Sequence, residues 1–261
     1  MDIIRKVHVN APFGFLVEKH LDWFIQKNIN PEIGLDAKYL DRFSHDAFMQ
    51  TAKKLHSKNL SVTFHGPFND LSPGSSDPLI WKVTKQRYEQ VLRLVPVFRP
   101  KTLVCHAGYD WKRFHFIREE WIEKSLDMWS WLASRLEDEG AVLTLENVYE
   151  HYPEDLKMIF QGLADKNVGF CFDIGHQSAF SRTSAKHWIE VLGPFLAQLH
   201  IHDNDGTQDQ HKGLGTASIE FPAFFKRLKT IRNVPPVVTL ETHQEEDLFP
   251  SLEYLEKIWP W

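Results

Sequence analysis

The sequence has few cysteines, no long apolar run and no strong net charge. Cys105 and Cys171 are the only cysteines among 261 residues, and both lie inside apolar runs, which excludes a disulfide framework and is typical of a reduced compartment. No stretch reaches the roughly 18 apolar residues of a transmembrane helix, and the N-terminus lacks the apolar core of a signal peptide. We therefore expect a cytoplasmic protein without a membrane partner. The formal net charge of −5 gives no reason to expect a nucleic-acid partner.

The sequence also lacks a linker, a solenoid repeat and a low-complexity tract, so we expect one domain over residues 1–261. Hydrophobic residues make up 43% of the chain, enough for a large core. Short apolar runs alternate with helical patterns, and each run is typical of a β-strand. The eight runs are 3–9, 32–35, 61–65, 102–106, 141–146, 168–173, 196–202 and 237–241.

Segments with helical spacing separate these runs. Ser44 is a suitable N-cap for a helix whose apolar positions are Phe48, Ala52 and Leu55. Strands that alternate with helices indicate parallel βαβ units, and eight units in about 250 residues predict an α/β fold, a single (β/α)8 TIM barrel. The alternative is an open doubly wound sheet, but no glycine-rich fingerprint follows the first run.

Side chains alternate between the two faces of a strand, so each run has a large apolar series and a small or polar series. We expect the apolar series to face the surrounding helices and the polar series to face the barrel axis. The polar series of strands three to eight ends in an ionisable residue at the C-terminal end, where barrel enzymes carry their chemistry. These residues are His65, His106, Glu146, Asp173, His200 and Glu241.

Converging carboxylates repel one another unless protons or a cation neutralise them, and carboxylates mixed with imidazoles are the usual ligands of Zn, Mn, Fe or Co. His176, Asp209 and His211 follow the sixth and seventh strands and extend this set. Some of the histidines would alternatively only support ligands through hydrogen bonds. His202 and His243 are interpreted as such supporting or bystander residues.

The order of several short motifs resembles the xylose isomerase-like TIM barrel superfamily, which contains sugar isomerases, sugar and sugar-phosphate epimerases, and endonuclease IV. The resemblance covers nearly the whole chain. Its markers begin at His8, Phe64, His106, Leu145, Phe172, His200, Asp209 and Leu240 and read HVN, FHGP, HAG, LEN, FDIGH, HIHD, DQH and LET.

The resemblance implies a divalent-metal cofactor, zinc or manganese, with one to three ions. The epimerases hold one ion on a set that looks like Glu146, Asp173, His200 and Glu241. The three zinc ions of endonuclease IV also use residues similar to a second set. That second set is His65, His106, His176, Asp209 and His211. The glycine-rich loop of endonuclease IV after the first strand is not evident, which argues against DNA docking.

The sequence is therefore interpreted as a metal-dependent isomerase or epimerase of a small sugar or sugar phosphate, in carbohydrate metabolism. Glu146 and Glu241 would exchange the proton, and His176 would hydrogen-bond a sugar hydroxyl. Expected substrate contacts are His8, Phe68, Trp111, Arg113 and Phe114. The alternative is an endonuclease IV-like phosphoesterase, in which several metals stabilise an in-line displacement. The sugar is not specified by the sequence, and a homo-oligomer stays open.

Overall fold

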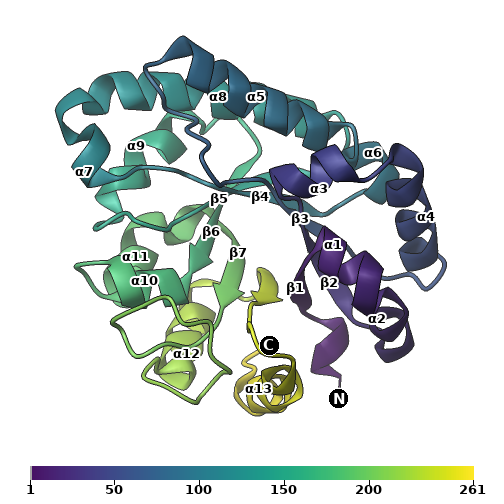
Figure 1. Ribbon diagram of the computed structural model, residues 1–261. Helices are drawn as coiled ribbons and strands as arrows, with labels where there is room; N and C mark the ends of the chain where they lie inside the picture. Colours follow the sequence, from purple (N-terminus) through teal and green to yellow (C-terminus); the bar gives the residue numbers. More distant parts are fainter. Residues whose placement is uncertain (1) are drawn as a thin grey trace.

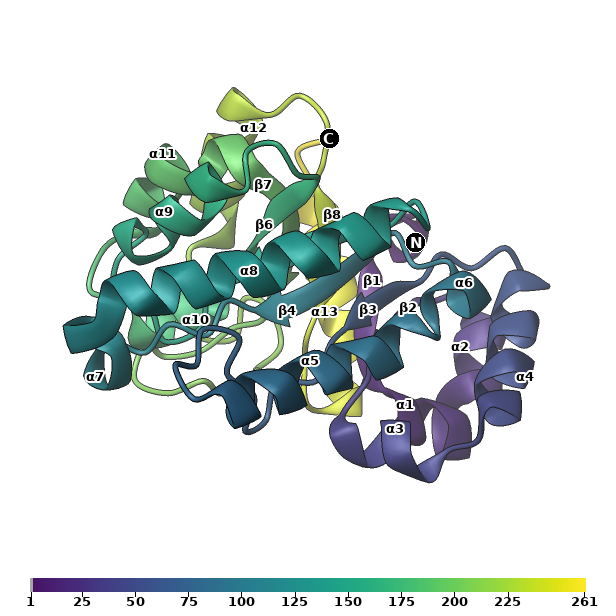
Figure 2. The same ribbon diagram turned by 90° about the horizontal axis from the view of Figure 1, so that it is seen from above.

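Residues 2–261 are described by the computed structural model, and within them eight parallel strands close into a barrel in sequential order. Helices surround the barrel on the outside, and the long helix α8 (Arg118–Glu137) packs beside α5 (Pro78–Leu92), as Figures 1 and 2 show. The predicted (β/α)8 barrel is confirmed. Because all strands run in the same direction, their C-terminal ends meet at one mouth.

The strands are three to six residues long. Their bounds are β1 His8–Pro12, β2 Asn30–Gly34, β3 Thr63–His65, β4 Thr102–His106, β5 Val142–Glu146, β6 Val168–Asp173, β7 Leu196–Ile201 and β8 Val237–Leu240. The pairing of β1 with β8 joins His8 to Thr239 and closes the barrel.

The helices alternate with the strands, and several are single turns. The N-terminal half contains η1 Ile3–Arg5, α1 Phe13–Phe15, η2 Leu16–His20, α2 Leu21–Lys27, α3 Ala37–Arg42, α4 His45–His56, α5 and α6 Val95–Phe98. The C-terminal half contains α7 Trp111–Phe114, η3 His115–Ile117, α8, α9 Glu154–Gly162, α10 Ile174–Phe180, α11 Ala185–Leu192, η4 Gly193–Phe195, α12 Phe221–Ile231 and α13 Glu245–Ile258. The predicted N-cap of α4 is present, since Ser44 Oγ accepts a hydrogen bond from the backbone nitrogen of Ala47 at 3.3 Å. Within residues 2–261, no helix has the length and apolar character needed to span a membrane.

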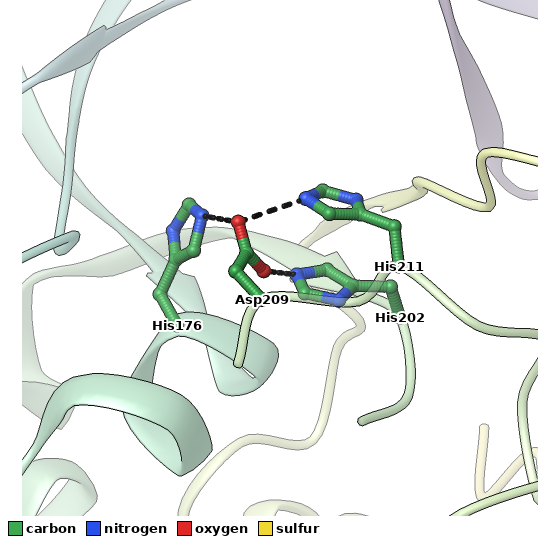
Figure 3. A group of neighbouring side chains, drawn as sticks. All are labelled: His176, His202, Asp209 and His211. Atoms are coloured by element: carbon green, nitrogen blue, oxygen red, sulfur yellow. Dashed lines mark hydrogen bonds and ion pairs between the residues drawn. The ribbon is translucent and has the colours of Figure 1, made fainter. Parts of the chain in front are cut away.

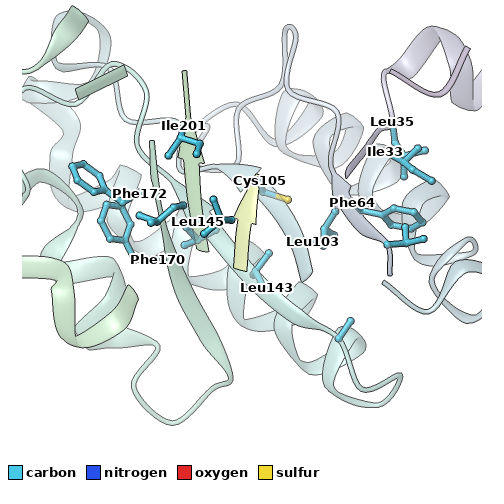
Figure 4. Packing of buried hydrophobic residues seen from close by; sticks show 14 of the residues in the cluster. Ile33, Leu35, Phe64, Leu103, Cys105, Leu143, Leu145, Phe170, Phe172 and Ile201 are labelled. Atoms are coloured by element: carbon cyan, nitrogen blue, oxygen red, sulfur yellow. The ribbon is translucent and has the colours of Figure 1, made fainter. Parts of the chain in front are cut away.

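The strands present opposite chemistry on their two faces. Outward side chains such as Phe64, Leu143 and Phe170 are buried against the helices and form one continuous apolar core (Figure 4). Most inward side chains near the mouth are polar, and Thr63 and Thr144 are fully buried inside the barrel. The face alternation predicted from the sequence is therefore present, and it directs the polar series toward the mouth.

The first strand differs from its prediction. The run 3–9 was expected to be extended, but Ile3–Arg5 forms the short turn η1, and β1 begins only at His8. The turn packs on α13, where the backbone nitrogen of Asp2 donates to Glu256 Oε1 at 2.7 Å. Ile3 and Val7 of this run are buried in the apolar core. The strand itself continues through Asn10 to Pro12, where an apolar pattern is absent.

Candidate metal centre at the mouth of the barrel

The strand ends bring titratable side chains into three neighbouring groups, each with ligand atoms within 4.8 Å of one another. The central group is Glu146, Asp173, His200 and Glu241. The first histidine group is His65, His106 and Glu146, and the second histidine group is His176, His202, Asp209 and His211. All nine residues expected as metal ligands therefore lie together. Their role as ligands stays a prediction.

The central group is built around the imidazole of His200. Its Nδ1 lies 3.0 Å from Glu146 Oε1, 3.3 Å from Glu241 Oε1 and 4.0 Å from Asp173 Oδ2. These residues lie at or within one residue of the C-terminal ends of four consecutive strands, β5 to β8, and are almost wholly buried. Three carboxylates around one nitrogen form the oxygen and nitrogen donor set that a divalent transition metal prefers.

The first histidine group shares Glu146 with the central group. His65 Nε2 lies 3.2 Å from Glu146 Oε2, and His106 Nε2 lies 3.5 Å from the same oxygen. Because Oε1 faces the central group and Oε2 faces the histidines, one carboxylate can serve two neighbouring cation sites.

The second histidine group surrounds Asp209 (Figure 3). Its Oδ2 lies 3.3 Å from His176 Nε2 and 3.2 Å from His211 Nε2, and its Oδ1 lies 3.5 Å from His202 Nε2. His202, which was interpreted from the sequence as a supporting or bystander residue, is fully buried inside this group, and that interpretation stays a prediction. The ring also stacks on that of His211, with centroids 3.7 Å apart.

Local backbone structure fixes these side chains. Asp173 ends β6 and caps α10, where its Oδ1 accepts from the backbone nitrogen of His176 at 2.6 Å. The cap turns the helix so that His176 returns to the mouth one turn later. Asn147 holds the ends of β5 and β6 together, since its side chain bonds both the backbone nitrogen and the carbonyl of Asp173 at 3.0 and 2.9 Å.

His211 has a positive φ of 47°, a conformation that costs a non-glycine residue roughly 1 kcal/mol or more. Two contacts hold it there. Its Nδ1 lies 2.7 Å from the carbonyl oxygen of Glu241, and its ring stacks on that of His243 at 4.0 Å. The strained backbone thus aims the opposite nitrogen, Nε2, at Asp209.

The pKa values show how the side chains of the site balance one another's charge. Burial raises the pKa of Glu146, but His200 and the other imidazoles outweigh this and hold that pKa well below its usual range. Burial lowers the pKa of His176, but Asp173 and its neighbours raise it well above its usual range. The pKa of Glu241 is raised by burial and by Glu146, against the opposing effect of His200. Protons on imidazoles therefore neutralise carboxylates at the site, and a cation would take the place of those protons.

The donor atoms fit a divalent cation. Among residues 2–261, several buried atoms of the site have no hydrogen-bond partner, namely Asp173 Oδ2, Asp209 Oδ1 and both ring nitrogens of His202. His202 Nε2 lies at ion-pair distance from Asp173 Oδ1, 3.2 Å, but without hydrogen-bond geometry. Buried polar atoms without partners are costly, and a bound ion would satisfy them.

A cavity of about 370 Å³ opens above these groups. This volume lies in the range of small-molecule sites. Phe68 forms part of its wall and stacks on the ring of His106, with centroids 4.3 Å apart. The remaining lining residues are Asn10, Pro12, Gly34, Leu35, Asp36, His65, Asn69, Glu146, Val148, Tyr149, His176, Phe180, Asp209, His211, Glu241, Thr242 and His243.

Three expected substrate contacts lie elsewhere. Trp111 is 46% exposed and stacks on His115, and Phe114 is buried against Trp121. Both belong to the short helix α7, which turns their side chains away from the cavity. Arg113, on the same helix, lines an adjoining hollow that also contains Asp110 and Glu150.

His8, the fourth of these expected substrate contacts, also lies away from the cavity. Because β1 begins at His8, this residue lies at the end of the barrel opposite the mouth. Its Nε2 lies 3.0 Å from Ser61 Oγ, and burial lowers its pKa to about 4. The residues of β1 that line the cavity are Asn10 and Pro12.

Two buried glutamates near the site, Glu32 and Glu150, were not predicted from the sequence. Glu32 on β2 lies 3.0 Å from His200 Nε2 and is fully buried. The strand alternation that predicted an inward His65 also places Glu32 on the inward face of its own strand, so a signal for it existed. Glu150 follows β5 and accepts hydrogen bonds from the backbone nitrogens of Tyr109 and Val148 at 3.1 and 2.7 Å. It lies in a loop, where alternation gives no signal.

Comparison with known proteins gives concordant matches. The family model described as xylose isomerase-like TIM barrel matches residues 31–258. The uncharacterized protein MJ1311 of Methanocaldococcus jannaschii is 27% identical over 205 residues, which cover 76% of this chain and 70% of that protein. The TTHB071 protein from Thermus thermophilus, soaked with ZnCl2, has a TM-score of 0.84 at 24% identity, over 97% of this chain and 98% of its own. A D-tagatose 3-epimerase-like protein has a TM-score of 0.83 at 24% identity, over 97% of both chains. At this identity the structural likeness shows the fold.

Proposed function

Because the chain belongs to the xylose isomerase-like TIM barrel family, we propose that it is a divalent-metal-dependent isomerase or epimerase of a small sugar. The similarity to a D-tagatose 3-epimerase-like protein supports a sugar as substrate, and the soaking of a similar protein with ZnCl2 is in keeping with a metal. Five points stay predictions: the choice of zinc or manganese, the number of ions from one to three, the cytoplasmic location, the single-domain boundaries and the oligomeric state.

One observation carries the proposal. Glu146 and Glu241 both border the cavity, from β5 and β8, and both lie within 3.3 Å of His200 Nδ1. Moving a proton beside a carbonyl needs one group that removes the proton and another that returns it. Two carboxylates that reach the same cavity from different strands meet this requirement.

In this proposal the central group of Glu146, Asp173, His200 and Glu241 holds the cation. The ion would supply positive charge beside the sugar oxygens that become negative when the carbon loses its proton. One of the two glutamates removes that proton, and the other returns it to the same or the neighbouring carbon. His176, which also borders the cavity, would hydrogen-bond a sugar hydroxyl, and Phe68 would pack on the apolar face of the sugar.

An endonuclease IV-like phosphoesterase is the second candidate, and the shared ligand Glu146 favours it. The two histidine groups adjoin the central group, and several cations close together stabilise in-line displacement at phosphorus. The cavity argues against a nucleic acid, because none of its lining residues within 2–261 is Lys or Arg. Proteins that bind DNA draw most of their affinity from such cations on phosphates.

The test is an isotope experiment with a parallel cleavage assay. Zinc- and manganese-loaded protein is incubated in heavy water with a panel of free ketoses and ketose phosphates, and separately with DNA that contains abasic sites. We expect solvent deuterium at the carbon beside the carbonyl of at least one sugar and no cut DNA. Cleavage of the DNA without exchange on any sugar would establish the second candidate instead.

Glu241→Gln is the matching variant. It removes one charged donor from the central group, so we expect both the exchange and the metal affinity to fall, the latter by about 100-fold, or about 2.7 kcal/mol. Glu245→Gln is the control, because Glu245 follows closely in sequence but is exposed and pairs with His20. Equal metal content and equal exchange in both variants would remove Glu241 from the proposed mechanism.

A further inference from the structure

Glu32 is a fully buried carboxylate on β2, in a part of the barrel where the sequence suggested no functional residue. It lies directly against the central group, with Oε1 3.0 Å from His200 Nε2. Burial of a charge is unfavourable unless the charge is paired and hydrogen-bonded, so the contacts of Glu32 indicate its role in the site.

The second oxygen of Glu32 is held by three donors from three other strands. Oε2 accepts hydrogen bonds from Thr63 Oγ1 at 3.0 Å, Gln198 Nε2 at 2.6 Å and Thr239 Oγ1 at 2.9 Å. Because β3, β7 and β8 each contribute one donor, the carboxylate cannot turn without breaking several bonds. Its first oxygen, Oε1, is therefore fixed toward His200.

The two nitrogens of His200 face different partners. Nε2 faces Glu32, and Nδ1 faces the glutamates Glu146 and Glu241 of the central group. Carboxylate oxygens only accept, and both ring nitrogens face carboxylates. When a cation is bound by the central group and takes the lone pair of Nδ1, the ring proton is therefore left on Nε2, beside Glu32.

We propose that Glu32 is the positioning residue of the metal centre: it fixes the ring of His200 so that Nδ1 faces the cation. Asn10 extends this arrangement to a second ligand. Its Nδ2 donates to Glu241 Oε1 at 3.0 Å and lies 3.4 Å from Glu32 Oε1. Glu32 thus supports two of the four side chains of the central group without facing the cation itself.

The proposal rests on the metal site of the proposed function and is independent of the sugar. Its test compares Glu32→Gln with Thr63→Val in the full-length protein. The first change removes the charge that faces His200. The second removes one donor to the same carboxylate and leaves the contact with His200 in place, so it controls for general disturbance of the buried network.

Two readouts separate positioning from a structural role. The first is Co²⁺ affinity, followed by its visible absorption spectrum, which reports the coordination of the ion. The second is the ¹H–¹⁵N spectrum of the histidine rings, which shows which nitrogen of His200 carries a proton and how fast that proton exchanges with water. The second readout needs only the wild-type protein, so it applies even if Glu32→Gln does not fold.

We expect Glu32→Gln to bind Co²⁺ about 10- to 100-fold more weakly, with an altered spectrum, since supporting residues of metal ligands have effects of this size. Thr63→Val should weaken binding less than Glu32→Gln, because Gln198 and Thr239 still hold the carboxylate, and the wild type should show a slowly exchanging proton on His200 Nε2. Equal weakening in the two variants, or coordination of His200 through Nε2, would overturn the proposal.

Failure of the proposed function would give a different result from failure of the positioning proposal. If the wild type binds no Co²⁺, the metal-dependent function is wrong. The positioning of His200 is then decided by the metal-free spectrum, where a slowly exchanging Nε2 proton supports it and a freely exchanging one refutes it.

Discussion

The two faces of strand β6 carry side chains of opposite chemistry. Phe170 and Phe172 point outward and stack on Trp188, whereas Cys171 and Asp173 point into the barrel, and Asp173 reaches the metal centre. The outward residues are interchangeable in kind, since the core needs only volume and apolar surface. The inward residues are not, because each buried polar atom needs a specific partner.

Residues that stabilise the fold and residues that could carry the chemistry therefore lie on opposite faces of a single strand. Large aromatic residues on the outward face supply burial, while the inward face carries buried groups that stabilise the fold only as a connected set. Changes on one face should therefore leave the property of the other face nearly untouched, and the size of each effect can be estimated.

The largest effect is expected on the outward face. Phe170→Ala removes a ring that packs between Phe160 and Trp188, so the free energy of unfolding should fall by about 3–5 kcal/mol. Urea unfolding followed by circular dichroism measures this loss. The affinity of the folded variant for Zn²⁺ should equal that of the wild type. A marked loss of affinity would show that the two faces are coupled through β6.

A smaller effect is expected from Glu150, a buried carboxyl outside the three metal-ligand groups. Burial raises its pKa to about 7 from the ordinary 4.5, against the backbone hydrogen bonds that it accepts. The folded protein thus holds this proton more tightly than the unfolded chain does. The contribution of Glu150 to stability is therefore full below pH 4.5 and falls as the pH rises to about 7.

Glu150→Gln should remove this dependence on pH. Relative to the variant, the wild type should lose roughly 3 kcal/mol of unfolding free energy as the pH rises from about 4 to about 8. Unfolding curves of both proteins across this range measure the difference. Parallel curves would show that the pKa of Glu150 is not raised. Because Gln keeps the size of the side chain, packing stays matched.

The sequence predicted the strand ends well because alternation leaves little freedom. Once Thr63 faces inward, His65 must do so too, and the same holds for Thr144 and Glu146. The rule also applied to Glu32, but it was overlooked because β2 does not end in an ionisable residue. The ionisable residue lies two positions before the C-terminal Gly34, below the mouth.

The loops were predicted less well, because neither alternation nor helical spacing constrains a short segment. Asp110 accepts a hydrogen bond from the backbone nitrogen of Lys112 at 2.9 Å and starts the single turn of α7. That turn rotates Trp111 toward His115 and Phe114 into the core, away from the cavity. His202 lies one residue beyond β7, and the packing of the Asp209 loop, which alternation does not predict, brings it into the second histidine group.

The smallest effect is expected from Phe68, because it is an aromatic residue among the polar side chains at the mouth of the barrel. Its ring borders the cavity and stacks on His106, so it either contacts the substrate or merely holds a ligand in place. An aromatic contact contributes about 0.5–1.5 kcal/mol, so Phe68→Leu should raise KM for the accepted sugar by roughly 2- to 10-fold and leave kcat unchanged. Phe116→Leu is the control, because Phe116 is 71% exposed and packs on His115 instead. A fall in kcat together with a lower metal content would show instead that the ring of Phe68 holds His106 in place. The apolar face of the sugar would then pack on another aromatic residue of the cavity wall, Tyr149 or Phe180.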